Sequence, residues 1–117
     1  RVMVAVLVAA EAVALAYYRA VHDVTNSPLL RALCRQILRD EAAHLRFQGF
    51  SLARLGYHRL HKLAHEAVVI AAALVVYAGH ATLLRTAGRN AGRFLREVLA
   101  AHAIVVRAAE SSAWPKA

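Results

Sequence analysis

Helix-breaking residues are scarce in this chain, and they stand far apart. Its 117 residues include only five glycines and two prolines, and Pro28 and Pro115 lie near the ends of segments. The stretches between them are rich in alanine, leucine and arginine, which are strong helix formers. A chain of this length fits one domain with a single modest core. The sequence therefore predicts one all-α domain.

Periodicity and breakers divide the chain into four helical segments. The predicted helices span residues 2–23, 28–55, 60–86 and 93–112, and the tail 113–117 is predicted to be irregular. Asn26 or Ser27 is a plausible N-cap for the second helix, and Pro28 fits its first position. We expect an antiparallel four-helix bundle over residues 1–117. Its first part, 1–55, is a helical hairpin, and 58–112 is a second, apolar helical pair.

The charge balance is strongly basic, but the basic residues lack the pattern of a nucleic-acid site. Lysine and arginine outnumber aspartate and glutamate by 15 to 7, which gives a net charge of +8. The arginines of the second helix, and Arg85, Arg89, Arg93 and Arg96, have no interleaved aromatics and no phosphate-binding loop. We therefore expect them to form a solvated face, with no nucleic-acid partner.

The number of cysteines and the hydropathy of the chain indicate where in the cell the protein is expected. Cys34 is the single cysteine and belongs to no CxxC motif, so a reducing compartment, the cytoplasm, is predicted. The stretches 2–18 and 67–84 are apolar enough to require a membrane check, yet a buried bundle helix is favoured over a spanning helix for 67–84. No signal-peptide pattern is found at the N-terminus.

Two acidic residues are predicted to meet between the first two helices. Glu11 lies fifteen residues before Asn26, and Glu41 lies fifteen residues after it. At a rise of 1.5 Å per residue, both carboxylates are about 22 Å from the turn of an antiparallel pair. His44 follows Glu41 by three residues, so it projects from the same face of the second helix. We expect Glu11, Glu41 and His44 to lie at one level and to face each other.

A helical wheel places these residues on apolar faces. Glu41 and His44 share their side of the helix with Leu38 and Leu45, and Glu11 stands in an apolar stripe without a nearby cation on its own helix. An unpaired buried carboxylate costs several kcal/mol or becomes protonated, so two at one level need a compensating partner such as a metal ion. The alternative is that Glu41 pairs with Arg54 and His44 is a satisfied core histidine.

The run from Glu11 to the Asp40-Glu41-Ala42-Ala43-His44 motif resembles one hairpin of the ferritin-like di-iron carboxylate superfamily, over about residues 2–55. The resemblance implies iron or manganese as cofactor, with Glu11 as the lone glutamate, Glu41 as the bridging glutamate and His44 as the terminal ligand. Asp40 matches the acidic residue that supports a ligand histidine, and Tyr18 is placed beside the site. The implied activity is oxygen-dependent oxidation of a small or lipid-like substrate. The alternatives are a degenerate scaffold and a metal-free, membrane-associated bundle.

A single chain carries only half of such a site. Residues 58–112 offer Glu66, Glu97, His80 and His102, but no second ExxH, and Glu97 and His102 diverge by about 140° on the wheel. The missing hairpin is expected either upstream in a longer parent chain, because this sequence starts abruptly within an apolar helix, or in a second copy. A two-fold dimer is predicted, since residues 67–84 are apolar on all sides and need covering.

Three further histidines lie at helical spacing, namely His58, His61 and His65, near the start of the third helix. They could bind a transition metal, but a partly solvated helix start is favoured. Tyr18 and Cys34 each lie eight residues from the turn, so we expect them to pack together.

Overall fold

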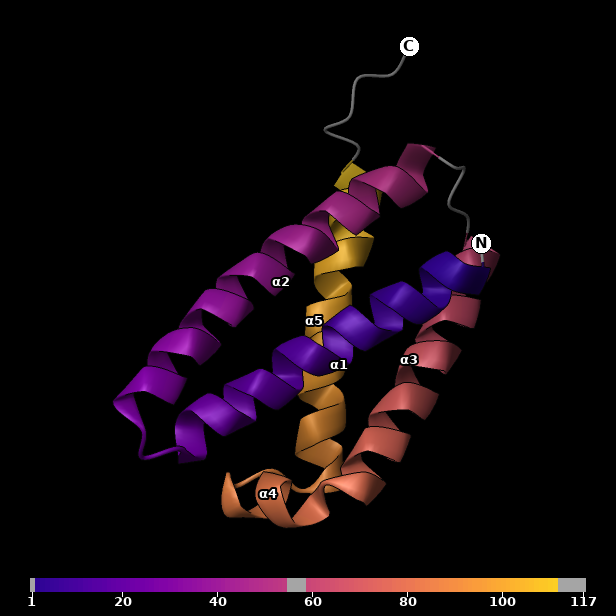
Figure 1. Cartoon of the computed structure of the whole chain (residues 1–117). Coiled ribbons are helices and arrows are strands. Elements are labelled where there is room, and N and C mark those ends of the chain that lie inside the picture. The colour runs from indigo at the N-terminus through magenta and orange to yellow at the C-terminus, as the bar shows by residue number, and fades with distance from the viewer. Residues whose placement is uncertain (1, 55–58, 112–117) are drawn as a thin grey trace.

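A computed structural model of the protein describes residues 2–54 and 59–111. Five helices account for nearly all of these residues, and no strand occurs among them. In chain order they are α1 (Val2–Val24), α2 (Pro28–Arg54), α3 (Arg59–Gly79), α4 (Ala81–Thr86) and α5 (Ala91–Ser111) (Figure 1). The predicted all-α class is confirmed.

The turn between α1 and α2 forms where the sequence placed it. The Ser27 hydroxyl accepts a hydrogen bond of 3.2 Å from the backbone N–H of Leu30, so Ser27 caps α2 and Pro28 is its first residue. The guanidinium of Arg31 donates to the carbonyl oxygen of Thr25 at 2.7 Å. These contacts close the hairpin with a connection of three residues, 25–27, and fix the register of α1 against α2.

The expected single helix over 60–86 is wrong, because the chain bends at His80. The backbone of His80 has φ −130° and ψ 26°, which lies outside the helical region and separates α3 from α4. Gly79, directly before it, has no side chain to favour continuation of the helix. The bend directs α4 across the end of the bundle, where Leu84 is fully buried. The described residues therefore form five helices instead of the predicted four.

The fourth predicted helix corresponds to α5 and begins two residues earlier than expected. The side-chain oxygen of Asn90 accepts a hydrogen bond of 2.7 Å from the backbone N–H of Arg93, so Asn90 caps α5. Gly88, with φ +77°, provides the left-handed turn after α4.

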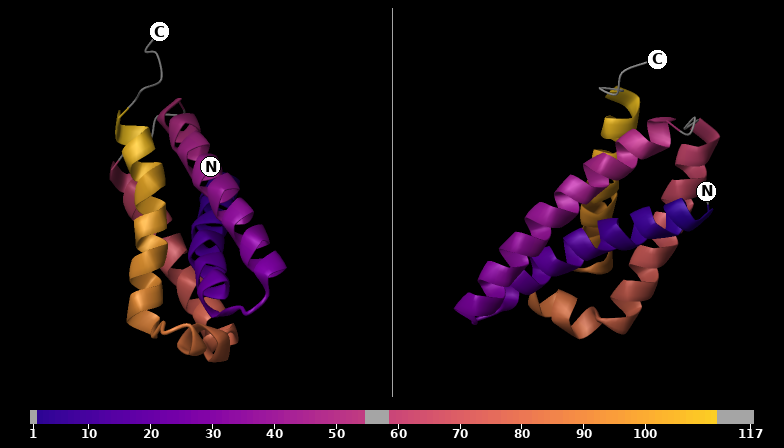
Figure 2. Two further views of the ribbon diagram at one scale, coloured as in Figure 1. Left: turned by 90° about the vertical axis from the view of Figure 1, so that its left-hand side faces the viewer. Right: turned by 45° about the horizontal axis from the view of Figure 1, so that its top comes forward.

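The core lies where α1 meets the other long helices. In Figure 1, α1 crosses between α2 and α3, and α5 lies behind α1 and α2; Figure 2 shows the same arrangement from two other directions. Small residues such as Ala12 and Ala20 are fully buried on α1 and allow close packing. Gly49 of α2 marks the tightest approach to α5, since a Cβ added there would lie 2.5 Å from the carbonyl oxygen of Val105. The largest fully buried side chains are Phe94, Leu45, Leu84, His102 and Val8.

One of the arginines expected on a solvated face is buried. Only 2% of Arg89 is exposed, and its guanidinium contacts Asp23 at 2.7 Å and Glu97 at 3.1 Å. Burial alone would raise the pKa of Asp23, but the hydrogen bond and charge of Arg89 hold that pKa below its ordinary value. Arg89 therefore joins the end of α1 to α5, whereas Arg85, Arg93 and Arg96 are exposed as predicted.

The outward sides of α1 and α3 remain apolar and exposed. Val6 is 52% exposed on α1, and Leu74 and Val75 are 50% and 72% exposed on α3. By length and composition, Met3–Val24 and Lys62–Gly79 could each cross a membrane, although nearly half of the former segment is buried within the protein. The other described residues, within 2–54 and 59–111, leave part of α3 uncovered.

Candidate metal centre

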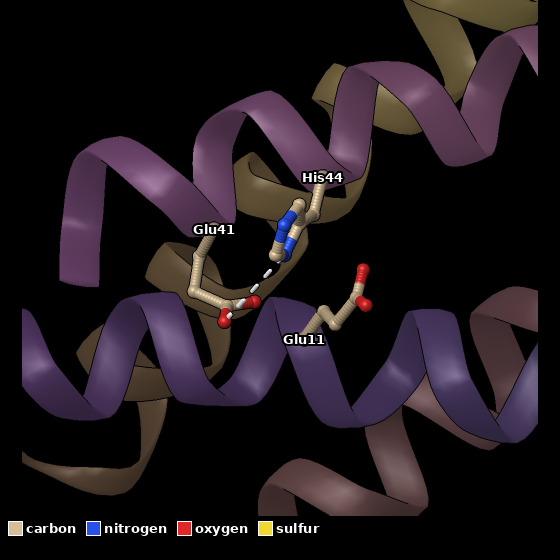
Figure 3. Close-up of side chains that lie close together, drawn as sticks. All are labelled: Glu11, Glu41 and His44. Atoms are coloured by element: carbon tan, nitrogen blue, oxygen red, sulfur yellow. Dashed lines mark ion pairs between the residues drawn. The ribbon is translucent and has the colours of Figure 1, made fainter.

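Glu11, Glu41 and His44 converge in the space between α1 and α2. One ligand atom from each lies within 4.8 Å of the other two. Figure 3 shows Glu41 and His44 projecting from α2 toward α1, with Glu11 rising from α1 to meet them. The predicted juxtaposition is confirmed, while the role of the three residues as metal ligands stays a prediction.

Each of the two carboxylates has one oxygen that is shielded from solvent and has no hydrogen-bond partner. The Oε2 atoms of Glu11 and Glu41 are shielded from solvent and accept no hydrogen bond. Burial raises the pKa of Glu11, the neighbouring Glu41 carboxylate raises it further, and His44 lowers it. Among the described residues, only His44 offsets the repulsion between the two carboxylates, and the net pKa of Glu11 stays raised.

His44 lies at the open edge of the group. Its side chain is 60% exposed, and its Nδ1 atom is 3.9 Å from Oε1 of Glu41, which is too long for a hydrogen bond. The sequence placed His44 on the inward, apolar side of α2, and the structure corrects this. His44 sits three residues after Glu41, at the border of the apolar face, so its ring reaches solvent while still approaching the carboxylates.

Asp40 and Tyr18 do not join the group. Asp40 is exposed and accepts a hydrogen bond of 3.0 Å from the side chain of Gln36, so it supports no histidine of the described chain. The ring of Tyr18 packs edge to face against Tyr17, with ring centroids 5.5 Å apart, on the α3 side of α1. Cys34 is buried.

The other acidic and histidine residues form no second ligand set within residues 2–54 and 59–111. Glu97 pairs with Arg89, and the ring of His80 packs against that of Tyr17. His65 is buried, whereas His58 and the side chain of His61 lie outside the described residues. The described residues thus offer one group of three candidate ligands, and its role as half of a metal site stays a prediction.

Sequence reasoning did not anticipate that His102 is a core residue. Only 1% of His102 is exposed, and its Nε2 atom has no hydrogen-bond partner. Burial lowers the pKa of His102, Glu66 raises it, and His65 and Lys62 lower it further. Its position on the same α5 face as Val98, Val105 and Val106 is the periodicity signal that could have identified it.

The donor set suits a first-row divalent metal. Two carboxylates and one imidazole are the ligand types that iron, manganese and zinc accept. The two shielded oxygens without partners supply the electrostatic reason for a cation there. No family model, curated protein or solved structure matches the chain. The metal-centre interpretation rests on these three side chains and their surroundings.

Proposed function

We propose that this protein binds redox-active divalent metal, iron or manganese, as one half of a dinuclear carboxylate site of the ferritin-like type. The observation that carries the proposal is the meeting of two carboxylates and an imidazole, with one ligand atom from each within 4.8 Å of the others, where each carboxylate also has a shielded oxygen without a hydrogen-bond partner. Glu11, Glu41 and His44 are the proposed ligands. A bound cation would neutralise the carboxylate pair; among the described residues no lysine or arginine forms an ion pair with either carboxylate.

The three residues have distinct proposed roles. Glu41 comes from the same helix as His44 and meets Glu11 across the hairpin, and we assign it the bridging role that the ferritin-like resemblance implies. Glu11 and His44 would each complete the coordination of an ion from one side. When bound, iron would supply activation of dioxygen for the oxidation of a small or lipid-like substrate, while the helices exclude water from the carboxylate side.

Three ligands do not saturate two ions, so the proposal requires a second hairpin. Exposed apolar side chains lie next to the ligands: Leu7, one turn before Glu11, is 48% exposed, and Phe47, one turn after His44, is 63% exposed. A second copy packed on this face about a two-fold axis would cover both residues and contribute its own ligand set. We propose a homodimer of this kind, located in the cytoplasm, where the thiol of Cys34 stays reduced.

Metal titration of the purified chain tests the proposal. Anaerobic Fe(II) should bind to the wild type at one ion per chain, and the Glu41→Ala/His44→Ala variant should lose this binding. The matched control, Glu66→Ala/His80→Ala, removes the same residue types elsewhere and should retain it. Equal and negligible metal in all three proteins would refute the metal function. Light scattering with and without metal would show whether two chains assemble. A chain that binds metal as a monomer would refute the site shared between two chains, but not metal binding itself.

The exposed face of α3 favours a second candidate function, that of a metal-free bundle associated with a membrane. Leu63, Leu74 and Val75 are each at least half exposed, and Lys62–Gly79 is apolar enough to enter a bilayer. Arginines around it could then contact anionic headgroups. Retention on anionic vesicles after a high-salt wash would support this function, and solubility without detergent together with loss in the wash would refute it.

A further inference from the structure

A long apolar groove runs between α1 and α3, on the other side of α1 from Glu41. Its volume is about 720 Å³, which lies within the range of small-molecule sites. Valines line its sides, among them Val6, Val13, Val68 and Val75, and alanines of both helices leave the hollow between them. The groove exists because these alanines face each other where larger side chains would close the gap.

One end of the groove is polar, and the other is not. The ring of Tyr17 lies 5.2 Å from that of His80 and 5.5 Å from that of Tyr18, and all three residues line the groove. Tyr17 and Tyr18 are the last two lining residues on α1, and His80 directly follows α3, so the three gather at one end, opposite Val6 and Val68. Neither the two hydroxyls nor the imidazole nitrogens bond to any part of the chain that the structure describes.

The dimensions suit an extended chain molecule. From Val6 to Tyr18 on α1, and from Val68 on α3 to His80 directly after it, the lining spans about 18 Å at the helical rise. A flat protein partner would contact the exposed rims of the two helices and leave the alanine floor unfilled. An alkyl chain is narrow enough to reach that floor along its whole length.

We propose that the groove binds a long-chain carboxylate, with its alkyl chain against the valines and alanines and its head group at Tyr17, Tyr18 and His80. A carboxylate accepts hydrogen bonds, and the hydroxyls and the imidazole N–H donate them. The net charge of +8 favours an anionic head group over a cationic one. Burial of the alkyl chain supplies the affinity, and the polar end sets its direction. The site is separate from the metal ligands and does not rest on the proposed metal function.

Calorimetric titration with palmitate tests the proposal in the purified chain. We expect one palmitate per chain for the wild type. Ala71→Phe, an exposed position that lines the groove, should weaken binding at least tenfold by filling the hollow. Ala32→Phe makes the same change at an exposed position on α2, away from the groove, and should leave binding unchanged. Circular dichroism establishes that each variant is folded.

A second set of variants tests the polar end without changing the volume of the groove. Tyr17→Phe and His80→Gln should each weaken palmitate binding several-fold, but they should leave binding of the neutral hexadecane unchanged. Failure of the wild type to bind palmitate, or equal affinity of the Ala71→Phe and Ala32→Phe variants, would overturn the proposal. So would dissociation of a dimer by Ala71→Phe, since a second copy would then occupy the groove. Unaltered Fe(II) binding by Ala71→Phe would separate this result from the metal function.

Discussion

Replacing Gly49 by alanine is expected to destabilise the protein, even though alanine is the better helix former. Gly49 is buried in α2 where this helix crosses α5. A Cβ at this position would lie 2.5 Å from the carbonyl oxygen of Val105 and 2.6 Å from the Cβ of Ala108. Neither neighbour can rotate away, because one is helix backbone and the other is a methyl group attached directly to it. The two helices must therefore separate.

The magnitude follows from the two opposing effects. Alanine gains about 0.5–1 kcal/mol over glycine inside a helix. Carbon atoms pack at about 3.5–4.0 Å, so α2 and α5 would have to separate by about 1 Å. Overpacking of this kind costs about 1–3 kcal/mol, because the separation also loosens neighbours such as Leu45 and Leu52. The clash exceeds the helix-propensity gain, and we expect a net loss of about 1–2 kcal/mol.

Gly79→Ala is the matched control, because a Cβ at Gly79 would meet nothing within 4 Å. This variant should be neutral or more stable than the wild type by up to about 0.5 kcal/mol. Urea unfolding followed by circular dichroism measures both variants, and shifted midpoints with an unchanged slope report stability directly. A Gly49→Ala protein that is as stable as the wild type, or a loss of equal size for Gly79→Ala, would refute the close approach of α2 and α5.

Three further predictions use the charged and titrating residues. Arg89→Met should destabilise the protein by about 2–4 kcal/mol in urea unfolding, because it removes the buried guanidinium that pairs with Asp23 and with the part-buried Glu97, whereas Arg96→Met at an exposed position should change stability by less than about 0.5 kcal/mol. Burial lowers the pKa of His102 in the folded chain below its ordinary value of 6.5. As the pH falls below about 6.5, the imidazole is therefore protonated more readily in the unfolded chain than in the folded one, and the free energy of unfolding should decrease. A His102→Met variant whose stability depends on pH as the wild type's does would contradict this. Glu11→Gln should stabilise the metal-free chain at pH 7 by about 1 kcal/mol and abolish Fe(II) binding, since burial and the adjacent carboxylate raise the pKa of Glu11 and make its ionised form costly. Glu110→Gln, at an exposed position, is the control and should do neither.

The geometry of the candidate site was accessible from the sequence because its determinants are local. The cap at Ser27, the turn before Pro28 and the constant rise of a helix fix the levels of Glu11 and Glu41. No long-range contact is needed to bring these two residues opposite each other. The exposure of His44 was not accessible, since it depends on which helices surround the hairpin.

Features that depend on contacts between distant segments could not be predicted from the sequence, because local patterns do not show which segments meet. Arg89 is like its neighbouring arginines in sequence, and it is buried only because Asp23 and Glu97 arrive from other helices. The hydropathy of residues 60–86 continues through His80, so the break there is visible only once α4 packs Leu84 into the end of the bundle.

The sequence by itself determined the helical class, the α1–α2 hairpin and the level of its acidic residues, because helix propensity, capping and rise act over a few residues. The tertiary structure decided how α5 crosses Gly49, which arginine is buried and where α1 and α3 leave a groove between facing alanines. Those outcomes depend on the angles at which helices cross, and crossing angles are set by side chains that lie far apart in the chain.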